Sequence, residues 1–148
     1  SSDVDGMVIA AHSDTGMLPL LTKATRNGVP VSAFLNEEQL NTVSEATKVG
    51  GATLTKLLGT SAWYAPGASV AFLVDSILND QKRMIPCSVY LEGEYGQQDI
   101  CIGVPCIIGK NGVEEIVNIA LNDAEKALFA KSADAVRAMN ADLKSVLV

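Results

Sequence analysis

The sequence predicts a single α+β domain in which helices pack on an antiparallel sheet. Apolar and β-branched runs on both sides of Glu92–Gly96 are typical of two antiparallel strands joined by a turn. Helical patterns precede and follow this hairpin, an order that favours α+β over a doubly wound parallel sheet. No GxGxxG turn joins a strand to a helix, so no Rossmann domain is expected. The 148 residues suffice for one core, and we expect residues 1–148 to form one domain.

The first expected element is a buried strand over Gly6–Ala11, which is an apolar run. It leads into a polar loop at His12–Gly16, and loops that follow strands are common places for functional residues. Leu18–Leu35 should be irregular or strand-like, because it contains the turn dipeptide Asn27-Gly28.

Two helices should follow. Asn36 can cap the first, with Glu37 and Glu38 near the positive end of its dipole, and Gly50-Gly51 should bend or break it. Thr60–Ala62 should open the second, with Pro66 in its first turn, where a missing N–H does little harm.

The rest of the chain should hold the hairpin and a final helix. The hairpin strands fall within Met84–Ile108, and a third strand is expected over Val113–Leu121. Asn122 should cap the last helix, with Glu125 completing a capping box. The apolar stripe expected to face the core consists of Leu121, Ala124, Leu128, Ala135, Met139 and Val146.

Composition and charge narrow the possible partners. The net charge of −6 has the wrong sign for attracting nucleic acid or anionic membrane surfaces, so neither is expected as a partner. A few arginines at a pocket could still bind an anionic substrate. The apolar runs are far shorter than the ~18 residues of a membrane-spanning helix. The polar, acidic start is unlike a signal peptide, and we expect a cytoplasmic protein.

The cysteines Cys87, Cys101 and Cys106 lie in apolar stretches without CxxC spacing. We expect buried, reduced thiols, although one of them acting with a histidine as a thiol hydrolase stays an alternative. No metal site is expected, because the chain has a single histidine and no convergent acidic ligands.

That histidine, His12, is the main candidate for proton transfer, because imidazole exchanges protons near neutral pH. Position alone leaves two interpretations open, since a single histidine after an apolar run is more often structural than catalytic. Asp14 could orient the imidazole or could equally stabilise its own turn.

Five motifs follow one another along nearly the whole chain. They are Asp3–His12, Asn27–Val31, Ser61–Ser69, Pro86–Gly96, and Gly103–Pro105 continuing to Gly109–Val113. Together they resemble the C-terminal half of malate dehydrogenases of the lactate dehydrogenase-like type, in which the first motif leads to the catalytic histidine.

The resemblance implies an antiparallel sheet with packed helices and a site at His12. His12 would donate a proton to the carbonyl of oxaloacetate and remove it from malate, with NAD as the cofactor. Ser61 and Ala62 would touch substrate, and Pro66 would lie near the nicotinamide. Lactate dehydrogenases commonly have threonine at the position of Ala62, so the smaller side chain fits the larger diacid. The family assembles as dimers or tetramers, and we expect a homo-oligomer.

Two departures from the family pattern affect these expectations. The usual HGDTMVPL reads His12–Leu20 here, with Ser13 for glycine and one added residue, and a serine fits poorly if that glycine has positive φ. Gly16 could relax the same turn. In addition, the family's histidine-orienting aspartate, substrate-binding arginines and NAD site belong to an N-terminal domain that this chain lacks. We therefore expect little activity without that half.

Two alternatives to malate oxidation remain. The chain could belong to a lactate or other 2-hydroxy acid dehydrogenase. It could also be a non-catalytic oligomerisation or binding module.

Overall fold

The computed structural model describes residues 3–144, and its strands pair only in antiparallel fashion within that range. One sheet has the order β1-β4-β5, and the other has the order β3-β2-β7-β6 with β8 paired to β7. This confirms the predicted α+β class with an antiparallel sheet. The elements are β1 (Val4–Asp5), β2 (Val8–Ala10), β3 (Met17–Pro19), β4 (Thr25–Arg26), β5 (Val29–Pro30), a 3-10 turn (Val31–Ala33), α1 (Glu37–Leu58), α2 (Tyr64–Leu78), β6 (Arg83–Glu92), a second 3-10 turn (Glu94–Gly96), β7 (Gln98–Gly109), β8 (Gly112–Ile116) and α3 (Asp123–Lys144).

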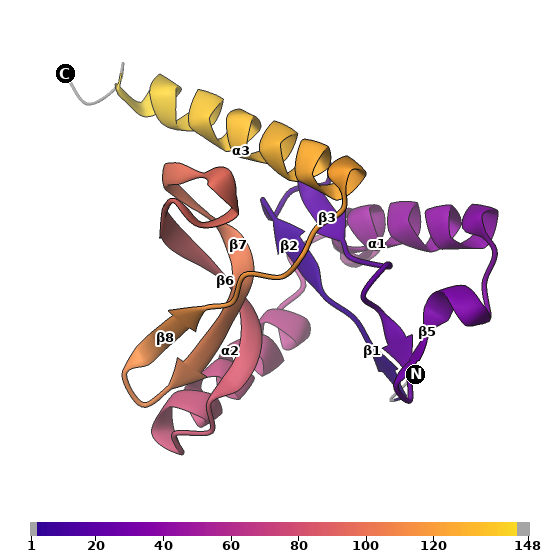
Figure 1. The fold of residues 1–148 in the computed structure, drawn as a ribbon, viewed down its shortest axis with the longest axis horizontal. Coiled ribbons are helices and arrows are strands. Elements are labelled where there is room, and N and C mark those ends of the chain that lie inside the picture. Colours follow the sequence, from indigo (N-terminus) through magenta and orange to yellow (C-terminus); the bar gives the residue numbers. More distant parts are fainter. Residues whose placement is uncertain (1–2, 145–148) are drawn as a thin grey trace.

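The larger sheet is the centre of the fold. Helix α3 packs on β2, β3 and β7, whereas α2 packs on β7 and α1 on β3 (Figure 1). The core lies between this sheet and α3, and its largest buried side chains include Ile9, Leu20, Leu91, Ile100 and Phe129. Strand β2 and helix α3 therefore share one core.

Helix α1 begins where the sequence predicts. Asn36 Oδ1 accepts from the N–H of Gln39 at 2.9 Å, and Gln39 Oε1 accepts from the N–H of Asn36 at 3.0 Å. The helix continues through Gly50 and Gly51 to Leu58, so the predicted break is wrong. A glycine costs only about 1 kcal/mol in a helix, which the hydrogen bonds on either side outweigh.

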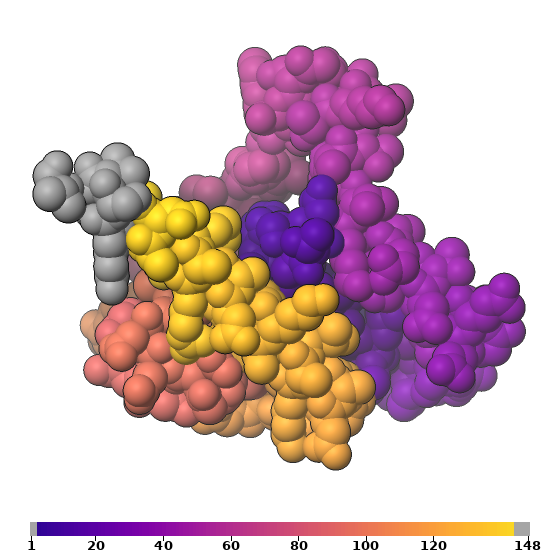
Figure 2. Space-filling model, turned by 90° about the horizontal axis from the view of Figure 1, so that it is seen from above, coloured from indigo at the N-terminus to yellow at the C-terminus, as the bar shows by residue number. Residues whose placement is uncertain are grey.

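The end of α1 has few neighbours in this chain. Residues 49–61 are all exposed, and Figure 2 shows the magenta end of α1 projecting from the rest of the molecule. Helix α2 then begins at Tyr64, slightly later than predicted, with Pro66 in its first turn as expected. Within residues 3–144, no helix combines the length and hydropathy needed to cross a membrane.

The third strand of the hairpin region is shorter than predicted, because β8 ends at Ile116 and not at Leu121. The N–H of Val117 donates to the carbonyl of Pro105 at 2.8 Å. Beyond this point the chain is held by hydrogen bonds to the Tyr95 hydroxyl. That hydroxyl donates to the Val117 carbonyl and accepts from the N–H of Ile119. Side-chain hydrogen bonds thus replace the ladder over the last predicted residues.

The capping box of α3 is confirmed, but its predicted buried face is wrong. The N–H of Asn122 donates to Glu125 Oε2 at 2.8 Å, and the N–H of Glu125 donates to Asn122 Oδ1 at 2.9 Å. Phe129 and Ala133 are buried, whereas Leu128 is 51% exposed. Ala124, Ala135 and Met139 are exposed as well, Leu121 is only partly buried, and Val146 lies outside the described residues. The sheet covers the face of α3 that contains Phe129 and Ala133, next to the face that was predicted. Apolar periodicity alone did not distinguish these two faces.

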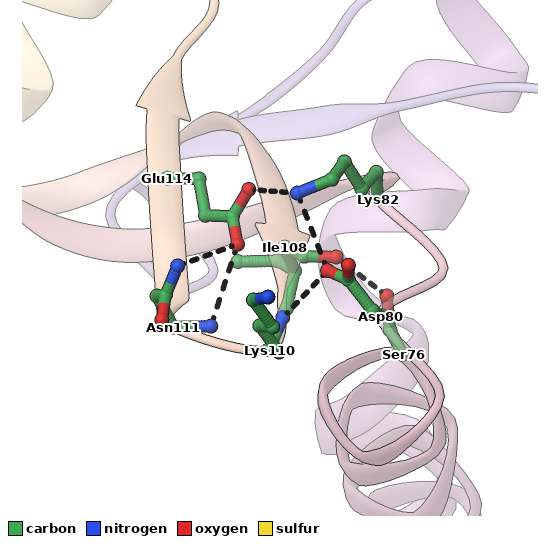
Figure 3. A network of polar contacts seen from close by, with 7 residues as sticks. All are labelled: Ser76, Asp80, Lys82, Ile108, Lys110, Asn111 and Glu114. Carbon is green, nitrogen blue, oxygen red and sulfur yellow. Dashed lines mark hydrogen bonds and ion pairs between the residues drawn. The ribbon is translucent and has the colours of Figure 1, made fainter.

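A polar network joins the turn after α2 to the turn between β7 and β8 (Figure 3). The N–H of Lys110 donates to Asp80 Oδ1 at 3.0 Å, and Lys82 Nζ contacts the same oxygen at 3.2 Å. Lys82 also donates to Glu114, which accepts from the N–H of Asn111 at 3.4 Å. These contacts hold the two turns together.

This network should make stability depend on pH. The Lys110 N–H, and then Lys82, lower the pKa of Asp80 below its ordinary value, and Lys82 does the same to the pKa of Glu114. The two carboxylates contribute fully to the free energy of unfolding above the ordinary carboxyl pKa values. That contribution is lost as the pH falls through the lowered pKa values. Glu114, and then Asp80, raise the pKa of Lys82, whose contribution is lost only as the pH rises through that raised value.

Lys82→Met should therefore be less stable than the parent chain in urea unfolding at pH 7. The difference should shrink as the pH falls through the lowered pKa values of Asp80 and Glu114, where both carboxylates become protonated. A difference of equal size at pH 2 and pH 7 would show that the network contributes nothing through charge.

Candidate functional site

His12 lies just beyond β2, where the strand leaves the sheet. Ala10, the last residue of β2, has a φ of 73° and pairs with Gly103 of β7. A Cβ at Gly103 would lie 2.7 Å from the Ala10 carbonyl oxygen, so only glycine permits this approach. The strand end and its unusual backbone direct the chain into the His12 loop.

The His12 loop accommodates the departures from the family pattern. Ser13 and Gly16 are not among the positive-φ residues of the described chain, so Ser13 is not strained in the way considered above. The N–H groups of Gly16 and Met17 donate to the Ser13 carbonyl at 3.0 and 2.9 Å. A Cβ at Gly16 would lie 2.6 Å from Ser13 Oγ and 2.8 Å from Ala11 Cβ. Gly16 thus provides the space that the serine occupies.

His12 is exposed and lines a pocket of about 520 Å³. The other lining residues come from β2, β3, β6, β7, α3 and the His12 loop, and they include Cys87, Ile102 and Val136. Apart from His12, the lining residues from the described chain carry no ionisable group other than cysteine. The pocket can therefore offer proton exchange beside an apolar surface, but a carboxylate would need a cation from elsewhere.

The other predicted site residues lie apart from this pocket. Ser61 and Ala62 precede α2, Pro66 is in its first turn, and none of the three is among the pocket's lining residues in the described chain. Ser61 and Pro66 are exposed, and Ala62 is half-buried. Within this chain, His12 and the predicted substrate residues therefore do not share one pocket.

The cysteines are only partly as predicted. Cys106 is buried, and burial raises its pKa to about 11, while burial also raises the pKa of Cys87. Such thiols are poor nucleophiles at neutral pH, which disfavours a thiol hydrolase using either one. Cys87 is only partly buried and Cys101 is exposed, so the prediction of three buried thiols holds for Cys106 alone. It lies between Ile100 and Ile102, which face the core, and alternation along β7 turns Cys101 to the other side.

Two residues at the site, Gly103 and Ser132, were given no role by the sequence analysis. The hydroxyl of Ser132 on α3 accepts from the N–H of Ala11 at 3.0 Å. A glycine inside a β-rich run is a known sign of close backbone approach, so Gly103 could have been found. Ser132 had no comparable signal, because its partner is 121 residues away.

Comparisons with known proteins agree with this architecture. Residues 1–146 match the family model of the lactate/malate dehydrogenase, alpha/beta C-terminal domain. The malate dehydrogenase of Flavobacterium johnsoniae is 74% identical over 148 residues, which are the whole of this chain and 48% of that protein. The malate dehydrogenase of Bacteroides thetaiotaomicron is 66% identical over 146 residues, or 99% of this chain and 47% of that protein. The chain thus spans about half the length of these relatives.

Solved structures show the same correspondence. Malate dehydrogenase from Salinibacter ruber aligns with a TM-score of 0.94 at 41% identity, over 98% of this chain and 47% of that one. Lactate dehydrogenase from Eimeria maxima, solved with NADH and oxamate, aligns with a TM-score of 0.92 at 41% identity, over the same shares. The chain therefore belongs to the lactate/malate dehydrogenase family and has the α+β fold of that family's C-terminal domain.

Proposed function

We propose that this chain is the substrate-binding half of an NAD-dependent malate dehydrogenase, with His12 as its proton donor and acceptor. The observation that carries the proposal is the placement of His12, exposed at the end of β2 and lining a pocket with apolar walls. A histidine enclosed in the core could not reach a substrate oxygen. The exposed ring is instead accessible to a ligand.

The chemistry requires a proton at the substrate oxygen. When the carbonyl of oxaloacetate is reduced, negative charge develops on its oxygen, and an imidazolium held against that atom neutralises it. In the reverse direction, neutral imidazole removes the proton from the hydroxyl of malate. NAD supplies the hydride acceptor or donor when bound.

This chain would contact the cofactor only at its nicotinamide end. Pro66 is exposed in the first turn of α2, where a nicotinamide held by another domain could reach it. The pocket at His12 contains no lysine or arginine among its described lining residues. Cations for the two carboxylates, and most contacts to NAD, would come from an N-terminal nucleotide-binding domain, without which the chain should be inactive.

The substrate should be the four-carbon diacid, although a lactate-type substrate is the competing assignment. By the family resemblance, Ala62 stands where lactate dehydrogenases commonly have threonine, and the smaller side chain would leave more room for a diacid. Lactate dehydrogenases from Eimeria maxima and Cryptosporidium parvum are nevertheless 41% and 34% identical to this chain, so the fold does not separate the substrates.

The free thiols suit a reducing compartment such as the cytoplasm.

Joining this chain to the N-terminal half of the Flavobacterium johnsoniae relative allows a direct test. NADH oxidation should be faster with oxaloacetate than with pyruvate at equal concentration. Ala62→Thr should lower kcat/KM for oxaloacetate, whereas Ala127→Thr at an exposed position of α3 should leave it unchanged. Preference for pyruvate would contradict the assignment, and no turnover with either acid would contradict the proposed function.

We also propose that α1 and α2 meet a second copy of the chain in a dimer or tetramer. Both helices expose large apolar side chains, an arrangement typical of interfaces. Leu57 is 79% exposed, Tyr64 is 93% exposed and Leu78 is 77% exposed. The others are Val43, Val49, Leu54, Leu58, Val70, Phe72 and Val74.

Light scattering on the joined enzyme should give the mass of a dimer or tetramer. Leu57→Asp should shift that mass toward the monomer, whereas the same charge placed at the polar exposed position Gln98 should not. A monodisperse monomer of the parent enzyme would contradict self-association.

A further inference from the structure

One long-range hydrogen bond fastens the His12 loop to helix α3. The N–H of Ala11 donates to Ser132 Oγ at 3.0 Å. Ser132 is 4% exposed and lies on the inner face of α3 beside Phe129 and Ala133, both of which are buried. Because water is largely excluded there, the bond competes with little solvent.

The backbone of Ala11 needs this acceptor because β2 ends one residue earlier. Ala10, with its positive φ, is the last residue paired with β3 and β7, so the N–H of Ala11 lies beyond the ladder. A backbone conformation of this kind persists only where its surroundings hold it. Gly103 holds it from the sheet side by close approach, and Ser132 holds the next peptide from the helix side.

Ala11, the donor of this hydrogen bond, directly precedes His12 in the chain. The N–H of Ser13 donates to the Ala11 carbonyl at 3.0 Å, which closes a γ-turn with His12 as its central residue. Both polar backbone groups of Ala11 are therefore engaged, one across the γ-turn and one by α3. The His12 loop packs closely against α3, because a Cβ at Gly16 would lie 3.1 Å from Ser132 Oγ.

We propose that Ser132 is a positioning residue for His12, whose hydroxyl holds Ala11 and thereby places the imidazole in the pocket. Helix α3 then has two roles at the site, since Val136, one turn further along, lines the same pocket. The catalytic consequence rests on the proposed function, but the positioning itself does not. The two can therefore be tested separately.

The first test observes the ring of His12 in the 148-residue chain by NMR, where a single histidine makes its signals unique. Ser132→Ala should shift the His12 ring resonances and speed exchange of the Ala11 amide roughly five- to tenfold. Ser132→Thr, which retains the hydroxyl, should give the parent His12 resonances and the parent exchange rate of the Ala11 amide. Ser132→Cys keeps the size with a weak acceptor and replaces the alanine variant if that one does not fold.

Ser76→Ala is the matched control. Ser76 is also a buried helix serine, and its hydroxyl donates to the Ile108 carbonyl at 2.7 Å (Figure 3). Neither Ser76 nor Ile108 lines the pocket at His12. This variant should leave the His12 signals and the Ala11 exchange rate unchanged. Unchanged His12 signals in Ser132→Ala, or equal changes in Ser76→Ala, would overturn the positioning role.

The second test measures turnover in the joined enzyme. Ser132→Ala should lower kcat for oxaloacetate roughly ten- to a hundredfold with little change in KM, because a displaced proton donor affects the chemical step. Ser132→Thr should recover most of the loss, and Ser76→Ala should retain the parent kcat. If the parent joined enzyme reduces no 2-oxo acid, the proposed function fails while the spectra still decide on Ser132. If the parent is active and Ser132→Ala matches Ser76→Ala in kcat, the catalytic consequence is wrong.

Discussion

Replacing His12 by asparagine in the joined enzyme should lower kcat for oxaloacetate by roughly 10²- to 10⁴-fold. Asparagine can still form a hydrogen bond to the substrate oxygen, but it cannot deliver or accept a proton. KM should change less than kcat, because the carboxylates of the substrate are expected to bind to cations of the other half. Stopped-flow measurement of NADH oxidation would separate the chemical step from product release.

Binding of NADH and thermal stability provide the controls for this variant. Both should be nearly unchanged, because the side chain is exposed and packs against little of the core. Lys23→Asn, which removes a charge at another exposed position outside the pocket, should retain the parent kcat. Near-normal turnover of His12→Asn would show that His12 is not the proton donor.

Phe129→Ala should destabilise the chain by about 3 to 5 kcal/mol. The phenyl ring is 2% exposed and lies 5.3 Å from the ring of Tyr95, centroid to centroid, within the core between α3 and the sheet. Removing it leaves a cavity that the surrounding strands cannot fill without moving. Urea unfolding followed by circular dichroism would measure the loss.

The neighbouring residue provides a matched control. Leu128 is 51% exposed, so Leu128→Ala should cost about 1 kcal/mol or less. The comparison tests which face of α3 meets the core, because the sequence favoured Leu128 and the structure buries Phe129. Equal losses from the two variants would contradict the observed packing.

Local features of the fold were predictable from the sequence. Asn36 and Asn122 cap α1 and α3, and Pro66 lies in the first turn of α2, as expected. The hairpin of β6 and β7 also lies where apolar runs flank Glu92–Gly96. Each of these depends on interactions between residues a few positions apart, and residue type and spacing are enough to identify them.

The candidate site was predictable only in part. The sequence identified His12 as the one histidine, and the family resemblance pointed to a role in proton transfer. The length of β8 and the exposure of Cys101 were not predictable, because a tyrosine hydroxyl and strand alternation decide them. The pocket itself combines residues of β2, β6, β7 and α3, whose approach no spacing along the chain describes.

By itself, then, the sequence determined the caps of α1 and α3, the place of the β6–β7 hairpin, the α+β class and the residue able to exchange a proton. Only the tertiary structure decided which face of α3 is buried and that Ser132 holds the peptide before His12. The physical reason is the range of the interactions. Caps and turns are formed by neighbours in the chain, whereas Ala11 and Ser132 meet only because α3 packs on the sheet that contains β2.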